Sequence, residues 1–204
     1  MRTKTPQELF WEGAFGAEYT DRNQILPEER LPFFSQVLQK TYGVRSVCEL
    51  GANKGHNLRA IAQLSPNYEL AGVEINPEAF QELQAIPQVQ AFQASIQEVE
   101  PHQQFDLVYT CGVLIHLNPD DLPTVYRKMY QLSARYILIN EYYNPSPVEL
   151  SYRGHGDRLF KRDFAAEFIE ANQNRVSVVD YGFLWKPLNP TWDNTTWFLL
   201  EKTA

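Results

Sequence analysis

The chain has 204 residues, with 18 Lys and Arg against 25 Asp and Glu, which gives a net charge of −7. Hydrophobic residues make up 44% and aromatic residues 13% of the chain, a composition typical of a soluble globular domain. The acidic balance disfavours wide nucleic-acid binding and a basic membrane-surface helix, and no apolar run has transmembrane length. We therefore expect neither a nucleic-acid nor a membrane partner.

Cysteine and histidine are scarce. Cys48 and Cys111 lie in apolar surroundings, which excludes a disulfide framework and favours a reduced compartment. The four histidines lack metal-ligand spacing, so we expect no metal site. The first residues contain no apolar stretch of signal-peptide length, so we expect a cytoplasmic protein.

The chain is expected to form one domain, with a helical, aromatic segment at 1–43 followed by an α/β region at 44–204. Apolar residues at helical spacing predict a helix over 31–42. Strands are predicted at 44–50, 69–74, 89–93, 105–110, 135–141, 176–183 and 196–201, and later helices at 57–64, 77–85, 119–132 and about 162–171. This alternation predicts a mostly parallel sheet with helices on both faces, and the last two strands, with no helix between them, predict one antiparallel strand.

The most informative segment runs from the first strand into a glycine-containing turn, Glu49-Leu-Gly51-Ala-Asn53-Lys-Gly55, and then a helix. Gly51 permits a tight turn and a close approach of a ligand to the backbone. Glu49 could accept hydrogen bonds from an ammonium group. Glu74 ends the next strand, where an acid commonly binds ribose hydroxyls. The turn and Glu74 together predict a nucleoside-binding site, against the alternative of a structural turn and a solvated acid.

These residues resemble class I S-adenosylmethionine-dependent methyltransferases, which usually have a second glycine where Asn53 stands. The resemblance implies a Rossmann-like fold with a seven-stranded, mostly parallel sheet, one antiparallel strand and helices on both faces. Longer strings resemble a narrower family, the methylases associated with pseudaminic acid biosynthesis; they are Phe10–Asn23, Cys111–Leu122, Tyr136–Pro147, Tyr152–His155, Lys161–Phe164 and Thr196–Lys202.

The resemblance implies S-adenosylmethionine as cofactor and S-adenosylhomocysteine as product. It places Glu49 at the methionine ammonium, Glu74 at the ribose and Ile75 at the adenine, with Thr110 beneath the methionine part. Many members have an acid at the adenine edge, where this chain has Ser95. The aromatic stretch with two glycines at 10–23 suits a lid. The residues expected to bind the cofactor are Tyr19, Arg22, Asn23, Glu49, Gly51, Ala52, Asn53, Gly55, Glu74, Ile75, Ser95, Ile96 and Thr110.

Two residues are candidates for the catalytic base. His116 precedes a capped helix and could deprotonate or position the acceptor, or simply bond to backbone. Glu141 ends the fifth strand and could hold a cationic amine or take a proton, or be a solvated strand-end acid. The polar, glycine-bearing segment after it suits a substrate loop. The residues expected to contact the acceptor are Tyr142, Tyr143, Tyr152, Arg153, His155 and Arg158.

The sequence thus favours methyl transfer to oxygen or nitrogen of a small polar molecule, with a nonulosonic-acid-type sugar or its precursor implied by the resemblance. An amine or guanidine acceptor is an alternative, because Glu141, Glu149 and several tyrosines could surround a cation. The sequence is also compatible with a nicotinamide-dependent oxidoreductase and with a catalytically silent cofactor-binding protein. The oligomeric state is left open.

Overall fold

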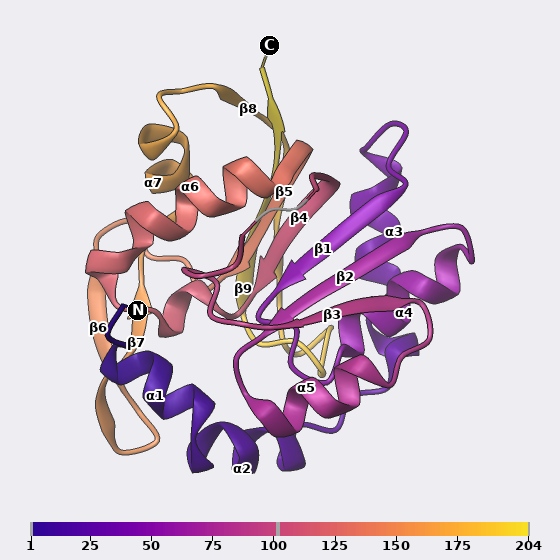
Figure 1. Ribbon diagram of the computed structural model, residues 1–204. Coiled ribbons are helices and arrows are strands. Elements are labelled where there is room, and N and C mark those ends of the chain that lie inside the picture. The colour runs from indigo at the N-terminus through magenta and orange to yellow at the C-terminus, as the bar shows by residue number, and fades with distance from the viewer. Residues whose placement is uncertain (1, 101–102, 204) are drawn as a thin grey trace.

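The computed structural model describes residues 2–100 and 103–203. Its centre is a seven-stranded sheet in the order β3-β2-β1-β4-β5-β9-β8 (Figure 1). The strands are β1 (Ser46–Leu50), β2 (Glu69–Glu74), β3 (Val89–Gln93), β4 (Phe105–Cys111), β5 (Ser133–Glu141), β8 (Val176–Leu184) and β9 (Thr195–Lys202). The first five pair in parallel, and β9 runs antiparallel to both β5 and β8. The predicted sheet is confirmed, including its one reversed strand.

Helices cover both faces of this sheet. On one face α3 (Leu31–Gln39), α4 (His56–Leu64) and α5 (Pro77–Gln84) bury residues such as Phe34, Ile61 and Leu83 in one apolar cluster. On the other, α6 (Leu122–Leu132) and α7 (Phe164–Ala171) bury residues such as Met129 and Phe168 in a second. These apolar stripes follow the helical period, which is why the sequence predicted the helices. No helix within the described ranges is long and apolar enough to cross a membrane.

Two predicted helices are shorter in the structure. Over 119–132 the chain first makes a short 3-10 turn, η3 (Pro119–Asp121), capped by Asn118, and α6 begins at Leu122 with Pro123 in its first turn. The helix predicted over 31–42 ends at Gln39, where the chain turns through Gly43 toward β1. α3 packs in the core, whereas α1 (Pro6–Glu12) and α2 (Ala14–Arg22) precede it and are placed to cover a site.

The segment expected to be an irregular substrate loop is a β-hairpin. β6 (Val148–Tyr152) pairs antiparallel with β7 (His155–Lys161), and Arg153 and Gly154 at its tip have φ angles of 51° and 85°. A two-residue turn with positive φ at both positions matches the twist of paired strands. In Figure 1 this hairpin (orange) and helices α1 and α2 (indigo) lie on the same side of the sheet. A hydrogen bond from Gln7 Nε2 to the Asp157 carbonyl, at 3.2 Å, joins them.

Candidate functional site

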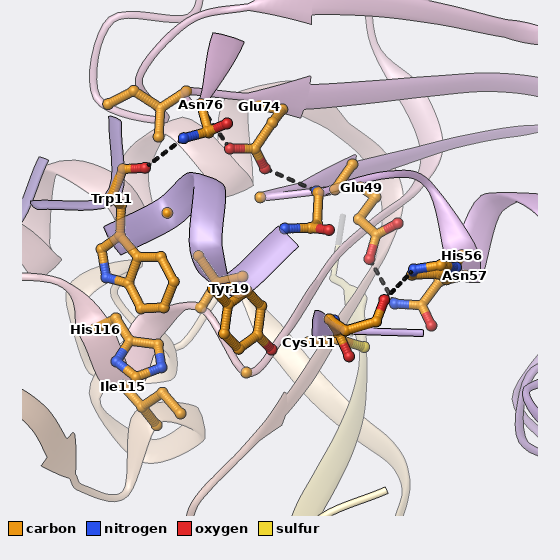
Figure 2. Close-up of a pocket in the computed structure, with 18 of the residues that line it drawn as sticks. Trp11, Tyr19, Glu49, His56, Asn57, Glu74, Asn76, Cys111, Ile115 and His116 are labelled. Carbon is orange, nitrogen blue, oxygen red and sulfur yellow. Dashed lines mark hydrogen bonds between the residues drawn. The ribbon is translucent and has the colours of Figure 1, made fainter. Parts of the chain in front are cut away.

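A cavity of about 520 Å³ lies where β1, β2 and β4 end, beneath α1, α2 and the hairpin. The ends of parallel strands in an open α/β sheet are where such folds bind ligands. Its walls come from the turn after β1, the ends of β2 and β3, α1, α2, the turn after β4 and residues 191–195. Figure 2 shows the labelled side chains of these segments facing one another.

The turn after β1 passes three times through the left-handed backbone region. Gly51, Asn53 and Gly55 have φ angles of 76°, 48° and 76°. Asparagine is one of the few residues other than glycine that adopt this region readily, which explains how Asn53 replaces the usual glycine. A Cβ atom on Gly51 would stand 2.6 Å from Val113 Cγ2, so this position requires glycine. The turn therefore brings its backbone to the edge of the cavity, while the N–H groups of residues 51–55 are bonded within the protein.

Glu74 fixes this turn. Its Oε2 accepts a hydrogen bond from the Asn53 backbone N–H at 2.7 Å, and its Oε1 accepts one from the Asn76 N–H at 2.7 Å. The residue is 7% exposed and faces the cavity. Burial raises the pKa of Glu74 from its ordinary value, although these backbone bonds oppose the rise. Each oxygen keeps acceptor capacity for a further donor, such as a ribose hydroxyl.

Glu49 carries a buried oxygen atom with no partner. Its Oε1 accepts a hydrogen bond from Asn57 Nδ2 at 2.6 Å, whereas no described residue bonds its Oε2. Burial raises the pKa of Glu49 to about 8. A buried acceptor left without a donor is costly unless a ligand satisfies it. The ammonium group of an amino-acid ligand has the charge and the hydrogen atoms that this oxygen lacks.

The two N-terminal helices are docked on the end of β2. Asn76 Nδ2 donates to the Trp11 carbonyl at 3.1 Å, and Asn53 Nδ2 donates to Thr20 Oγ1 at 3.1 Å. A Cβ on Gly16 would stand 1.8 Å from the Trp11 carbonyl oxygen and 2.8 Å from Asn76 Nδ2, so this close approach of α2 to α1 requires glycine. Figure 2 shows the Trp11 carbonyl bonded to Asn76, with the Trp11 ring beside His116 and the Tyr19 ring next to it. α1 and α2 thus cover this part of the cavity. We call residues 6–22 the lid.

His116 is placed as a neutral base. It belongs to the 3-10 turn η2 (Leu114–His116), and its Nδ1 donates a hydrogen bond to the Arg158 carbonyl at 2.6 Å. The proton is therefore on Nδ1, and Nε2 carries the lone pair. Burial lowers the pKa of His116 to about 4, so the ring is uncharged at neutral pH. It packs against the rings of Trp11 and Tyr152, with centroids 4.6 and 4.8 Å away, and these two rings also contact each other.

Glu141 has a different position from the one we expected for a catalytic group. It does not line the cavity, and its carboxylate accepts backbone N–H groups of Val113, Leu114 and Ile115 at 3.0, 3.1 and 3.4 Å. Burial raises its pKa to about 7. Glu141 therefore fixes the start of the turn that carries His116. Because Glu141 does not line the cavity, its position does not support the expectation that this acid acts directly on an acceptor.

Thr110, expected to bind the cofactor, also lies outside the cavity lining. It is fully buried and does not line the cavity, whereas Cys111 and Gly112 do. Successive residues of a strand point to opposite faces, and Tyr109 and Cys111 pack on the face of α3 and α4. Thr110 consequently points away from the cavity. Four other expected residues also lie outside its lining, for reasons that differ.

Gly55 begins α4, and a Cβ there would meet Ile86 at 2.5 Å, so it serves close packing of that helix. Tyr143 is 41% exposed, beside Phe198. The ring of His155 packs on the rings of Phe10 and Phe15. Arg158 acts through its carbonyl on His116 rather than through its guanidinium. The expected residues that do line the cavity are Tyr19, Arg22, Asn23, Glu49, Gly51, Ala52, Asn53, Glu74, Ile75, Ser95, Ile96, His116, Tyr142, Tyr152 and Arg153.

Sequence reasoning missed Arg30. Its guanidinium stacks on the ring of Trp192 at 3.6 Å and donates to the Thr191 carbonyl at 2.8 Å. The residue is 6% exposed and borders the cavity, yet its Nε has no described partner. No local pattern marks it, because 161 residues separate the two ends of that hydrogen bond. Trp11, Asn57, Asn76, Asn140 and Asp193 also line the cavity without having been predicted.

No cluster of three or more metal-ligating side chains occurs in residues 2–100 and 103–203. His102, one of the four scattered histidines, lies outside those residues.

The comparisons with known proteins point to methyltransferases. A family described as a methyltransferase domain matches residues 48–135. No curated protein matches the sequence. A 1,6-didemethyltoxoflavin-N1-methyltransferase from Burkholderia thailandensis, solved with S-adenosylhomocysteine, superposes with a TM-score of 0.74; it is 16% identical, over 100% of this chain and 93% of that one.

Two further solved structures are similar over nearly their whole length. Magnesium protoporphyrin IX methyltransferase from Synechocystis PCC 6803, solved with S-adenosylmethionine, has a TM-score of 0.71 at 13% identity and covers 100% of both chains. A sugar N-methyltransferase from Streptoalloteichus sp ATCC 53650 has a TM-score of 0.67 at 13% identity, over 100% of this chain and 96% of that one. The chain has the class I methyltransferase fold, and its residues 48–135 match a methyltransferase domain.

Proposed function

We propose that this enzyme transfers a methyl group from S-adenosylmethionine to an oxygen or nitrogen of a small polar molecule, with a nonulosonic-acid-type sugar or its precursor as the leading acceptor class. The acceptor class is supported by the long strings that resemble pseudaminic acid-associated methylases. A sugar N-methyltransferase among the structurally similar proteins also supports it.

The cavity fits the cofactor. The orphaned Oε2 of Glu49 suits the ammonium, the free acceptor capacity of Glu74 suits the ribose, and the turn at Gly51 leaves room that a side chain would fill. When bound, S-adenosylmethionine supplies a methyl group already activated by its sulfonium. The protein therefore has to align the acceptor, exclude water and accept one proton.

We assign to His116 the role of accepting the proton that the acceptor loses. An acceptor hydroxyl would lose its proton to Nε2, while Nδ1 stays bonded to the Arg158 carbonyl. The Trp11 and Tyr152 rings pack against the imidazole and hold it, and the lid excludes water from it. This arrangement of His116, with one nitrogen fixed and the other free in the cavity, is the observation that carries the proposal.

An amine acceptor has its own support. Tyr142 and Asp193 both line the cavity, and the Tyr142 hydroxyl donates to Asp193 Oδ2 at 2.6 Å. Burial acts to raise the pKa of Asp193, but the bonds from Lys186 and Tyr142 outweigh it and the pKa lies below its ordinary value. Its ionised carboxylate beside aromatic rings suits a cationic amine. Glu141 and Glu149 do not surround a cation as expected, since Glu141 is buried in backbone bonds and Glu149 accepts from the Asp157 N–H.

The test has two stages. Titration calorimetry with S-adenosylmethionine and S-adenosylhomocysteine should show binding, whereas reduced nicotinamide cofactor should show none. Amino sugars, neutral sugars and nonulosonic acids are then screened for release of S-adenosylhomocysteine. Turnover of none of them despite cofactor binding would favour the silent binding protein.

With an acceptor in hand, His116→Asn keeps a donor near the Arg158 carbonyl but removes Nε2. We expect kcat to fall about 100- to 10,000-fold, the usual contribution of a positioned base, with cofactor affinity unchanged. His155→Gln is the control, since it replaces a nearby histidine of the hairpin whose side chain does not line the cavity. Equal activity of His116→Asn and the wild type would refute the role of His116.

A further inference from the structure

The end of the cavity beyond Glu74 is closed by two separate segments. Ser95 and Ile96 follow β3, and Gln7 and Glu8 come from α1. Since the acid at the end of β2 is the ribose ligand in nucleotide-binding sheets, the base belongs at this end. Assigning the adenine of the cofactor to this position rests on the proposed function.

The Ser95 side chain already makes two hydrogen bonds, which leaves it no donor and one lone pair to offer a base. Its hydroxyl donates to Glu8 Oε1, and its oxygen accepts the Gln97 backbone N–H at 3.2 Å. The residue to which Ser95 is bonded carries a carboxylate at this end of the cavity. Glu8 is 4% exposed and borders the cavity.

The carboxylate of Glu8 is fixed but not saturated. Oε1 accepts from Ser95 and from the Arg2 guanidinium, and Oε2 accepts from the Thr5 backbone N–H at 2.8 Å. A carboxylate has about four lone-pair sites, so one remains, on Oε2. Burial acts to raise the pKa of Glu8, but the Arg2 and Ser95 bonds outweigh it and lower the pKa from its ordinary value. Glu8 is therefore a charged, buried acceptor with room for one more donor.

We propose that Glu8 accepts a hydrogen bond from the 6-amino group of the adenine, so that the base is recognised by the lid rather than by the loop after β3. Lid closure then depends on the identity of the base. Glu8 would thus both recognise the base and stabilise the lid, because it also caps α1 through Thr5.

The test compares two ligands that differ only in the base. S-adenosylhomocysteine presents an amino group, whereas S-inosylhomocysteine presents a 6-oxo group that cannot donate to a carboxylate. The wild type should prefer the adenine ligand by about tenfold to a hundredfold, the usual effect of a hydrogen bond to a charged group. In Glu8→Gln the amide can donate to the 6-oxo group, so the preference should shrink at least tenfold.

Glu12→Gln is the matched control, because Glu12 lies on the same helix in an ion pair with Lys4 and does not line the cavity. It should keep the wild-type preference. A purely structural effect of Glu8→Gln weakens both ligands equally and leaves their ratio unchanged, which would overturn the proposal. Failure of the wild type to bind S-adenosylhomocysteine would instead overturn the proposed function and this inference with it.

A second measurement needs no variant. At equal saturation, S-adenosylhomocysteine should protect the amides of residues 5–12 from hydrogen exchange more than S-inosylhomocysteine does, because only the adenine ligand engages Glu8. Equal protection by the two ligands would overturn the inference even where Glu8→Gln fails to fold.

Discussion

Binding of S-adenosylhomocysteine at pH 7 is expected to release a proton from Glu49. Burial raises the pKa of this carboxyl to about 8, so about nine in ten molecules carry the proton at pH 7 before the ligand binds. An ammonium within hydrogen-bond distance of Oε2 lowers a carboxyl pKa by about 1 to 3 units. A shift of about 2 units leaves roughly one molecule in ten protonated, which corresponds to release of about 0.8 proton.

The same linkage sets the pH dependence of affinity. Because the complex holds fewer protons than the free protein, binding should tighten as pH rises, by about sixfold per unit around pH 7. Calorimetry in phosphate and in Tris, whose ionisation enthalpies differ, measures the proton count from the difference in binding enthalpy. Both effects should be nearly absent in Glu49→Gln, which has no proton to lose.

Glu141 provides an internal control for this experiment. Its pKa is also raised, to about 7, but it does not line the cavity, and it is retained in Glu49→Gln. Protons released by a general change in the fold would therefore still be released by the variant. A wild type that releases no proton, or a variant that releases as many as the wild type, would refute the placement of the ammonium at Glu49.

Three further predictions concern stability, each measured by urea unfolding against the wild type. Gly51→Ala should cost about 1–3 kcal/mol, because its φ of 76° and the 2.6 Å approach to Val113 both oppose a Cβ; an unchanged midpoint would contradict this. Glu141→Ala should cost about 1–3 kcal/mol by leaving buried N–H groups of η2 without an acceptor, and a neutral effect would refute its structural role. The pKa of His116 falls from 6.5 to about 4 on folding, so protonation favours the unfolded chain, and stability should fall by up to about 3 kcal/mol from pH 6.5 to 4. His116→Gln should lose that part of the acid sensitivity, and equal sensitivity in both proteins would contradict the burial argument.

The sheet was predictable from sequence because its signals are local. Apolar strands bounded by glycine and proline, and helices with one apolar face, are determined by residues a few positions apart. The strands predicted at 69–74 and 89–93 have the same bounds in the structure. The glycine turn was predictable for the same reason, since the strand, the turn and the acid at Glu74 follow one another in the chain.

Thr110 was wrongly expected at the cofactor because it ends a predicted strand. That prediction did not consider which face of the sheet its side chain occupies. Cys111 and Thr110 are neighbours, so their side chains lie on opposite faces of the sheet. Glu141 shows a second difficulty, because a strand-end acid in contact with ligand and one that holds a backbone turn have the same sequence context.

The walls above the sheet could not be derived locally, since they are joined by contacts between distant segments. Gln7 meets Asp157 across 150 positions, and Ser95 meets Glu8 across 87. The aromatic lid was expected from its composition, but the hairpin beside it was expected to be irregular. The two strands of the hairpin can pair because the tip residues, Arg153 and Gly154, both adopt positive φ.

One strand end connects all these parts. Glu74 bonds to the turn at Asn53 and to the backbone of Asn76, and the Asn76 side chain bonds to the lid at Trp11. A ligand that bonds to Glu74 therefore acts on the turn and the lid through the same carboxylate. Trp11 in turn packs on His116, whose Nδ1 is held by the hairpin at Arg158. Occupation of the ribose position and the orientation of the base should consequently be coupled, because a displaced lid removes one of the two rings that hold the imidazole.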